Sequence, residues 1–171
     1  MKTLNWRHTD WNARNFVFQV GQEIIGQLSF YSVWNFNAVY TDSETKLKFA
    51  QKGFWSKILV TQEEKVVGKI DSGIFGRQTL TLSTGEVFRL STDFWGSNVR
   101  WSNAAGEIVV NYKQATMSSM GKGVIDLRDT MNTEVETLLI SAGLFIRQLT
   151  QKRRTLMVAL MLPILAAASR R

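Results

Sequence analysis

Residues 134–149, EVETLLISAGLFIRQL, decide the fold of this chain. From Thr137 to Ile146 there is no charged residue, so a helix formed there has no face suited to water. Its bulky side chains are interrupted by Ser141-Ala142-Gly143, where small residues let other groups come close to the helix. Such a helix needs apolar neighbours on all sides, inside a protein or inside a membrane.

The residues before this stretch mark where the helix begins. Asn132 or Thr133 can cap its amino end, because their side-chain oxygens accept hydrogen bonds from the first free backbone N–H groups. Glu134 and Glu136 fall in the first turn, where a negative charge suits the positive end of the helix dipole. We predict a helix over 134–150.

Upstream of the helix the chain has the pattern of short strands. Alternating apolar and polar residues separated by turn signals recur roughly every 8 to 12 positions, from about residue 16 to residue 128. A sheet of about a dozen strands closed into a barrel has a lumen that side chains alone do not fill, and this helix is the segment suited to fill it. Six apolar residues are predicted to face inward against the helix: Leu80, Leu82, Val99, Trp101, Ile125 and Leu127.

The predicted fold is therefore mainly β. It is a closed antiparallel β-barrel of about 12 strands, threaded by a hydrophobic carboxyl-terminal helix and followed by a short apolar tail helix. The barrel domain covers residues 1–151, and residues 152–171 form the tail. A rival interpretation inserts both apolar segments, 137–146 and 155–168, into a membrane and leaves an open β-sandwich outside.

Composition limits the protein class. A chain of 171 residues with 44% hydrophobic residues and six Trp is long and apolar enough to bury a substantial core. It has no Cys, which removes disulfides, thiolate metal sites and cysteine nucleophiles and favours a reducing compartment. Its first residues, MKTLNWRHTDWNARN, lack the apolar run of a secretory signal. We expect a cytoplasmic protein, peripheral or tail-anchored at the inner face of a membrane.

The net charge of +7 is unevenly distributed. Residues 1–133 hold 15 basic and 12 acidic residues, whereas residues 134–171 hold 6 basic and 2 acidic ones, so the last 38 residues carry +4 of the excess. Basic proteins of this kind bind anionic membrane surfaces or nucleic acid. The basic residues of the tail flank apolar runs and are not interleaved with aromatic ones, which favours lipid over nucleic acid.

The tail from Thr155 to Ser169 is apolar between basic flanks. Its uncharged apolar run, 156–168, would be about 20 Å long as a helix, short of the roughly 20 residues that cross a bilayer comfortably, and Pro163 interrupts it. Three alternatives remain: a short tail anchor, an interfacial or re-entrant segment, or a helix packed on the barrel or on a partner chain. If the tail spans a membrane, the basic flank next to the barrel is expected on the cytoplasmic side.

The segment from Val67 to Leu82, VGKIDSGIFGRQTLTL, is the most specific motif upstream. It resembles the superfamily that unites tubby carboxyl-terminal domains, phospholipid scramblases and LURP-one-related proteins, in which a Gly-Lys strand is followed by a polar turn and a second alternating strand. The strand-turn-strand units at 82–88 and 102–109 are similar to those of the same superfamily. The resemblance covers roughly 16–150 and implies a closed antiparallel barrel threaded by a hydrophobic helix.

The resemblance also implies a lipid site. In tubby-like domains the Lys of the Gly-Lys strand and a basic residue two positions later bind a phosphoinositide headgroup. Lys69 matches the first position, but Asp71 stands at the second, and its carboxylate is expected to repel a phosphate and to pair with Lys69. Scramblase-like relatives imply calcium-dependent lipid movement, yet the sequence has no D-x-D-x-D-G calcium loop.

The sequence provides no catalytic constellation and no cofactor or metal motif. His8 is the only histidine, and we interpret it as a surface residue. Gly121-Lys122-Gly123 lacks the remaining residues of a phosphate-binding loop and is interpreted as a turn.

The sequence therefore indicates a non-enzymatic, membrane-associated lipid-binding or scaffold protein of the tubby-like or scramblase-like type. The alternative is a soluble β-barrel interaction module that binds a protein partner, or itself, through the tail helix. Nucleic acid is the least favoured partner. The candidate lipid-headgroup residues are Lys69, Lys152, Arg153, Arg154, Arg170 and Arg171.

Overall fold

The computed structural model of the chain describes residues 2–32, 36–52, 57–72, 77–92, 98–114, 121–129 and 131–168, without the side chains of 153–168. Twelve strands form one closed antiparallel barrel in which each strand pairs with its neighbours in sequence, and the first strand closes the barrel against the last. The strands are β1 (Lys2–His8), β2 (Asn15–Val20), β3 (Glu23–Phe30), β4 (Ala38–Thr41), β5 (Lys46–Lys52), β6 (Lys57–Gln62), β7 (Lys65–Ser72), β8 (Gln78–Leu82), β9 (Val87–Thr92), β10 (Asn98–Ser102), β11 (Ile108–Gln114) and β12 (Lys122–Leu127).

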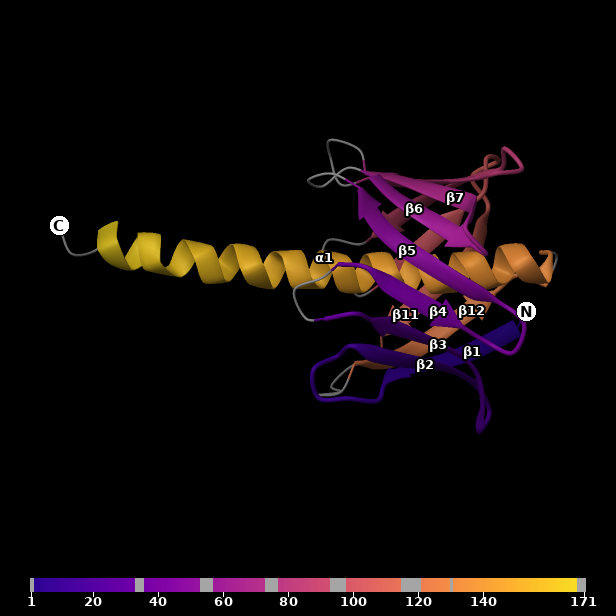
Figure 1. Cartoon of the computed structure of the whole chain (residues 1–171), viewed down its shortest axis with the longest axis horizontal. Helices are drawn as coiled ribbons and strands as arrows, with labels where there is room; N and C mark the ends of the chain where they lie inside the picture. The colour runs from indigo at the N-terminus through magenta and orange to yellow at the C-terminus, as the bar shows by residue number, and fades with distance from the viewer. Residues whose placement is uncertain are drawn as a thin grey trace.

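One helix, α1 (Thr133–Ala168), runs through the barrel and continues well beyond it (Figure 1). It begins at the end of the barrel where even-numbered strands turn into odd-numbered ones, which we call the entry end. It leaves at the opposite end, where odd-numbered strands connect to even-numbered ones, which we call the exit end. This arrangement confirms the predicted barrel with a threaded helix.

The start of α1 is fixed by Asn132. Its side-chain Oδ1 accepts a hydrogen bond of 3.1 Å from the backbone N–H of Glu134, and its carbonyl oxygen accepts one of 2.9 Å from the N–H of Glu136. Of the two predicted capping residues, Asn132 is therefore the one that acts as the N-cap. Glu136 also pairs with Lys2 at 2.6 Å, which ties the first turn of the helix to the first strand.

The residues of α1 inside the lumen are buried on every side, as expected of a helix without a polar face. All residues from Leu138 to Leu149 are less than a tenth exposed. The six strand residues predicted to face inward are also buried, with at most 7% of the surface of any one exposed. The apolar core is therefore the helix together with the inner wall of the barrel.

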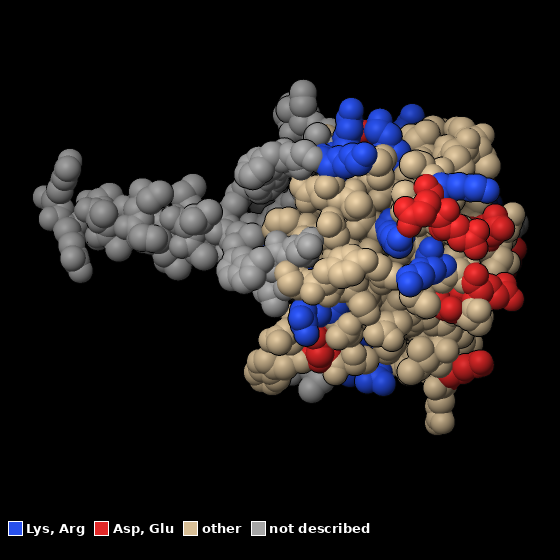
Figure 2. Space-filling view, viewed as in Figure 1, with Lys and Arg blue, Asp and Glu red and all other residues tan. Residues whose placement is uncertain are grey.

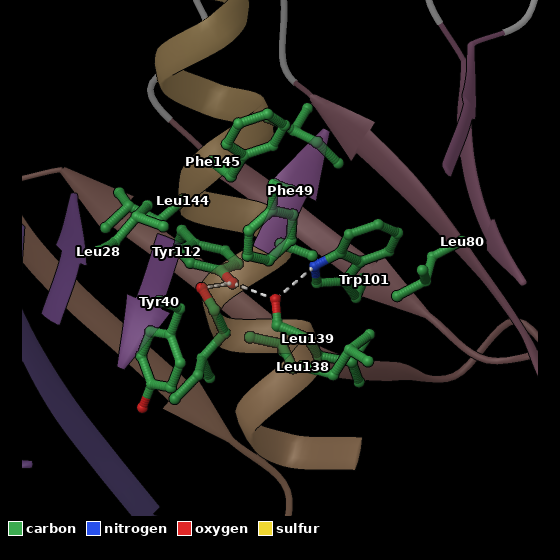
Figure 3. Packing of buried hydrophobic residues seen from close by; sticks show 14 of the residues in the cluster. Leu28, Tyr40, Phe49, Leu80, Trp101, Tyr112, Leu138, Leu139, Leu144 and Phe145 are labelled. Atoms are coloured by element: carbon green, nitrogen blue, oxygen red, sulfur yellow. Dashed lines mark hydrogen bonds between the residues drawn. The ribbon is translucent and has the colours of Figure 1, made fainter. Parts of the chain in front are cut away.

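Two polar aromatic side chains fix the height of the helix in the lumen (Figure 3). Trp101 donates a hydrogen bond from Nε1 to the carbonyl oxygen of Leu139 at 3.1 Å. The hydroxyl of Tyr112 lies 2.8 Å from the same oxygen and 2.9 Å from that of Ile140. The approach of Tyr112 is possible because Gly143 has no Cβ, which would overlap the phenol ring. The small-residue stretch of the sequence has this structural role.

Further along the lumen, aromatic rings stack on the helix. The ring of Phe145 lies between Phe49, at a centroid distance of 4.8 Å, and Phe30, at 5.6 Å, with interplanar angles of 21° and 10°. Flat rings on both sides fill the space that a uniform aliphatic helix would leave next to the curved wall. The stack lies towards the exit end and holds the last buried turns of the helix in place.

The structure differs from the predicted elements in three places. β1 was not predicted, although Leu4 and Trp6 alternate with polar residues; it closes the barrel by pairing with β2 and β12. The sequence predicts breaks in the run 16–30 at Gly21 and Gly26, but Gly26 lies inside β3, where the missing Cβ leaves room for the ring of Tyr40. The helix at 134–150 and the apolar tail form one continuous helix, which passes through Pro163 without ending.

Candidate functional site

The most distinctive surface of the molecule is the exit end, where α1 emerges from the barrel. The β1–β2 loop, the ends of the odd-numbered strands and the starts of the even-numbered ones surround the helix there. Two basic side chains of the helix, Arg147 and Lys152, lie at this level. Their contacts define the geometry of the site.

Arg147 is the inner of the two and is only 9% exposed. Its guanidinium carbon lies 4.7 Å from the centroid of the Trp6 ring, and its Nη2 donates a hydrogen bond to Oε1 of Gln114. Burial lowers the pKa of the guanidinium, because removal from water disfavours the charged form. The aromatic face and the amide oxygen partly replace the lost hydration and make Arg147 an internal brace between the helix, β1 and β11.

Lys152 is the outer residue and lies on the rim. Its Nζ is 4.0 Å from the centroid of Phe30 and has no hydrogen-bond partner among the described residues. Burial lowers the pKa of this ammonium group first, and the nearby positive charge of Arg14 lowers it further, while Asp10 opposes the shift. An anion that reaches the rim would therefore stabilise the charged form of Lys152.

The β1–β2 loop is held against the rim by short polar contacts. Asp10 accepts hydrogen bonds of 2.9 Å from the backbone N–H groups of Arg14 and Asn15. His8 donates from Nδ1 to the carbonyl oxygen of Asp10 at 2.9 Å and accepts at Nε2 from the N–H of Gly121. His8, which the sequence analysis interprets as a surface residue, is partly exposed, and its ring links two connections of the exit end.

The two ends of the barrel carry opposite charge. We define each collar as the connections at that end with the two terminal positions of every strand that begins or ends there, and for the entry end also the first turn of α1. The described exit collar holds two acidic residues and seven basic ones, namely Arg7, Arg14, Lys52, Lys57, Arg77, Lys113 and Lys122. The entry collar holds four basic residues and eleven acidic ones, namely Glu23, Asp42, Glu44, Glu63, Glu64, Glu86, Glu107, Asp126, Asp129, Glu134 and Glu136.

Counted over the described residues, the net formal charges are thus +5 at the exit collar and −7 at the entry collar. On the face shown in Figure 2, the acidic residues gather at the end opposite to the projecting helix. Most of the exit-collar basic residues lie on strand ends and are exposed. The barrel therefore has a charge separation along the axis of its helix, with the positive end where the helix leaves.

Two large aromatic side chains are exposed at the exit end. Trp11, in the β1–β2 loop, is 95% exposed, and Tyr31, directly after β3, is 59% exposed. Exposed aliphatic residues occur at the entry end, among them Ile24 and Ile108. Apolar exposure therefore occurs at both ends, and the charge of the collars is what distinguishes them.

Of the candidate headgroup residues that the sequence suggested, Lys69 and Lys152 lie in different parts of the structure. Lys69 lies on the outer wall of β7, and its Nζ pairs with Oδ2 of Asp71 at 2.8 Å, as expected from their spacing on one face of a strand. Lys152 is at the rim of the exit end. Arg153 and Arg154 belong to α1, but their side chains lie outside the described part of the chain, as do Arg170 and Arg171 altogether.

Sequence reasoning missed the exit-collar residues. Lys52 and Lys57 face each other directly across the β5–β6 pair, and Lys122 faces Arg7 across β12 and β1. In the sequence, each of these residues has the pattern of an ordinary solvent-exposed strand residue. The signal that could have found them is positional, because basic residues fall where odd-numbered strands end and even-numbered strands begin.

In the residues that the structure describes, no group of three or more His, Asp or Glu side chains is placed to hold a metal ion. Among those same residues, no helix combines the length and the hydropathy needed to cross a bilayer.

No family model matches this chain, and no match was found among curated proteins or solved structures. The resemblance to the tubby, scramblase and LURP-one-related superfamily therefore stays a prediction.

Proposed function

We propose that this chain is a non-enzymatic, membrane-associated protein that binds anionic lipid through the basic-flanked apolar tail of α1, in the manner of a tubby-like or scramblase-like domain. The observation that carries the proposal is the continuity of α1, which joins the buried core helix to the tail without a break. Residues 153–168 extend about 24 Å as a helix beyond Lys152. The apolar run of the tail therefore projects from the exit end, which is the positive end of the barrel (Figure 1).

The physical role of the barrel follows from the burial of the helix. Withdrawing α1 from the lumen would expose to water the apolar residues between Leu138 and Leu149. Burial of each large apolar side chain contributes about 1.5–3 kcal/mol to the stability of the seated helix. The burial therefore keeps α1, and with it the start of the tail, seated in the barrel. Insertion of the tail into a lipid surface would fix the orientation of the barrel on that surface.

The length of the tail suits entry from one side of a bilayer. A helix of about 24 Å is shorter than the roughly 30 Å hydrocarbon core, and basic residues on both flanks favour anionic headgroups. The alternative function is a soluble interaction module whose projecting helix pairs with a partner protein or with a second copy of itself. The same projecting helix supports that alternative, so the experiment must separate the two.

The test is co-sedimentation of the full chain with vesicles of phosphatidylcholine alone and with added phosphatidylserine. We expect binding that requires the anionic lipid and that falls at least tenfold in Leu160→Glu/Ile164→Glu, which places two charges on one face of the tail. The control, Asn5→Glu/Gln27→Glu, adds the same charge to exposed positions in the middle of β1 and β3, outside both ends of the barrel, and should change binding by less than threefold. Absence of vesicle binding together with tail-dependent dimers in analytical ultracentrifugation would establish the alternative instead.

A further inference from the structure

We propose that the exit end of the barrel is itself a membrane-contacting face, so that the barrel stands end-on on an anionic bilayer with the axis of α1 crossing the lipid surface. This inference rests on the proposed lipid-binding function and adds a second contact, made by strand ends and the β1–β2 loop and not by the tail. The occupant is a bilayer that contains anionic phospholipid.

The first argument is electrostatic complementarity. The described residues of the exit collar carry +5 and those of the entry collar −7, so a negatively charged surface attracts one end of the barrel and repels the other. Within the described residues, Lys52, Lys57, Arg77 and Lys122 form no ion pair, so their charges are available to headgroups. Lys52 and Lys57 face each other across β5 and β6, and on the other side of Lys57 stands Asp71, whose carboxylate is paired with Lys69 at 2.8 Å.

The second argument is geometric. The exit collar surrounds the point from which the tail projects, so any surface that takes up the tail must come close to the collar. The ammonium group of Lys152, which has no described hydrogen-bond partner, lies at this point between helix and wall. A phosphate oxygen of a lipid headgroup would supply the partner that the ammonium lacks.

The third argument is the chemistry of the exposed aromatic side chains. Trp11 and Tyr31 project at the exit end, and Trp and Tyr are the residues that favour the interface between headgroups and hydrocarbon. The exposed aliphatic residues at the entry end lie among carboxylates, which an anionic surface would repel.

The test compares two charge reversals of equal size in the full chain. Lys52→Glu/Lys57→Glu alters the exit collar, and Lys46→Glu/Lys65→Glu alters exposed lysines of the entry collar, so both variants change the net charge by the same amount. We expect the exit variant to bind phosphatidylserine-containing vesicles at least twentyfold more weakly than the unaltered chain, and the entry variant to be within threefold of it. Equal weakening in both variants, or none in the exit variant, would overturn the end-on orientation.

Because the chain has no cysteine, a second readout of orientation is direct. Asn12→Cys places a label in the β1–β2 loop, and Ala105→Cys places one in the β10–β11 turn at the entry end. An environment-sensitive fluorophore should shift to shorter wavelength on vesicle binding at the first site only. Binding of the full chain with shifts at neither site, or at the entry site, would overturn this inference and leave the proposed function standing, whereas no binding of the full chain to anionic vesicles would overturn both.

Discussion

The phenol ring of Tyr112 occupies the space that a Cβ atom on Gly143 would need. The hydroxyl of the same ring lies within hydrogen-bond distance of the carbonyl oxygens of Leu139 and Ile140, at 2.8 and 2.9 Å. One glycine in the helix and one tyrosine in β11 therefore set the position of α1 along the barrel axis. The orientation of everything beyond the exit end depends on this contact.

Gly143→Ala should lower the free energy of unfolding by about 2–3 kcal/mol, because the added methyl group forces the Tyr112 ring away and breaks its hydrogen bonds. Alanine favours a helix over glycine by about 1 kcal/mol, so a loss of stability would reflect the tertiary contact alone. Urea unfolding followed by tryptophan fluorescence measures the effect. Ser141→Ala is the control and should cost less than about 1 kcal/mol; a stabilised Gly143→Ala variant would contradict the close contact.

The buried tyrosines should make the protein sensitive to alkali. Burial raises the pKa of the Tyr112 phenol well above its usual value, and burial followed by the charge of Asp42 raises that of Tyr40. Above about pH 10 the phenols of the unfolded chain lose their protons while the folded ones keep theirs, so ionisation favours unfolding. Each buried phenol should reduce the free energy of unfolding by about 1.4 kcal/mol per pH unit in that range.

Urea unfolding between pH 9 and pH 11.5 measures this dependence. Tyr112→Phe and Tyr40→Phe should each flatten the fall in stability with pH, whatever their effect at neutral pH. Tyr31→Phe is the matched control, because the Tyr31 side chain is 59% exposed. A slope unchanged in both buried-site variants would show that these phenols ionise freely in the folded protein.

Arg147→Lys should destabilise the protein by about 1–3 kcal/mol although the charge is kept. A lysine ammonium cannot reproduce the flat contact of the guanidinium with Trp6 together with the hydrogen bond to Gln114. Thermal unfolding measures the loss, and Arg100→Lys, on the exposed outer side of β10, should change stability by less than about 0.5 kcal/mol. Equal losses of stability at the two positions would show that Arg147 does not brace the exit end.

A chain that ends at Gln151 should keep its fold, because the fully buried part of α1 ends at Leu149. We expect an unchanged near-ultraviolet circular dichroism spectrum and a loss of no more than about 2 kcal/mol, part of it from the missing contact between Lys152 and Phe30. The same chain should lose most of its binding to anionic vesicles. Unfolding on truncation would mean that residues beyond Gln151 support the barrel.

Asp71→Asn should increase binding to anionic vesicles about fivefold, because it removes one of two described carboxylates of the exit collar and frees Lys69 from its ion pair. Stability should change by less than about 1 kcal/mol, since the pair is exposed to solvent. Glu86→Gln removes one carboxylate from the entry collar and serves as the control in the same sedimentation assay. A larger effect from the control would contradict the end-on orientation.

The lipid-binding interpretation of the sequence relied on Lys69 and the basic tail. The structure shows Lys69 in an ion pair and places further basic residues at the exit end. The sequence could predict that Lys69 pairs with Asp71, because residues two apart in a strand share a face. The alternating direction of consecutive strands could place Lys52 and Lys122 at the same end of the sheet, but only the closed barrel with its threaded helix shows that α1 leaves at that end.

The sequence by itself determined the helix and its surroundings. A run without charge from Thr137 to Ile146 has no stable place in water, and alternating strands upstream provide the one wall that can enclose it. Only the tertiary structure decided that β1 closes the wall, that α1 continues unbroken into the tail, and that acidic and basic residues separate to opposite ends. The closure by β1 arises from pairing between residues more than a hundred positions apart, such as Leu4 with Ile125, and local sequence patterns do not specify pairing at that distance.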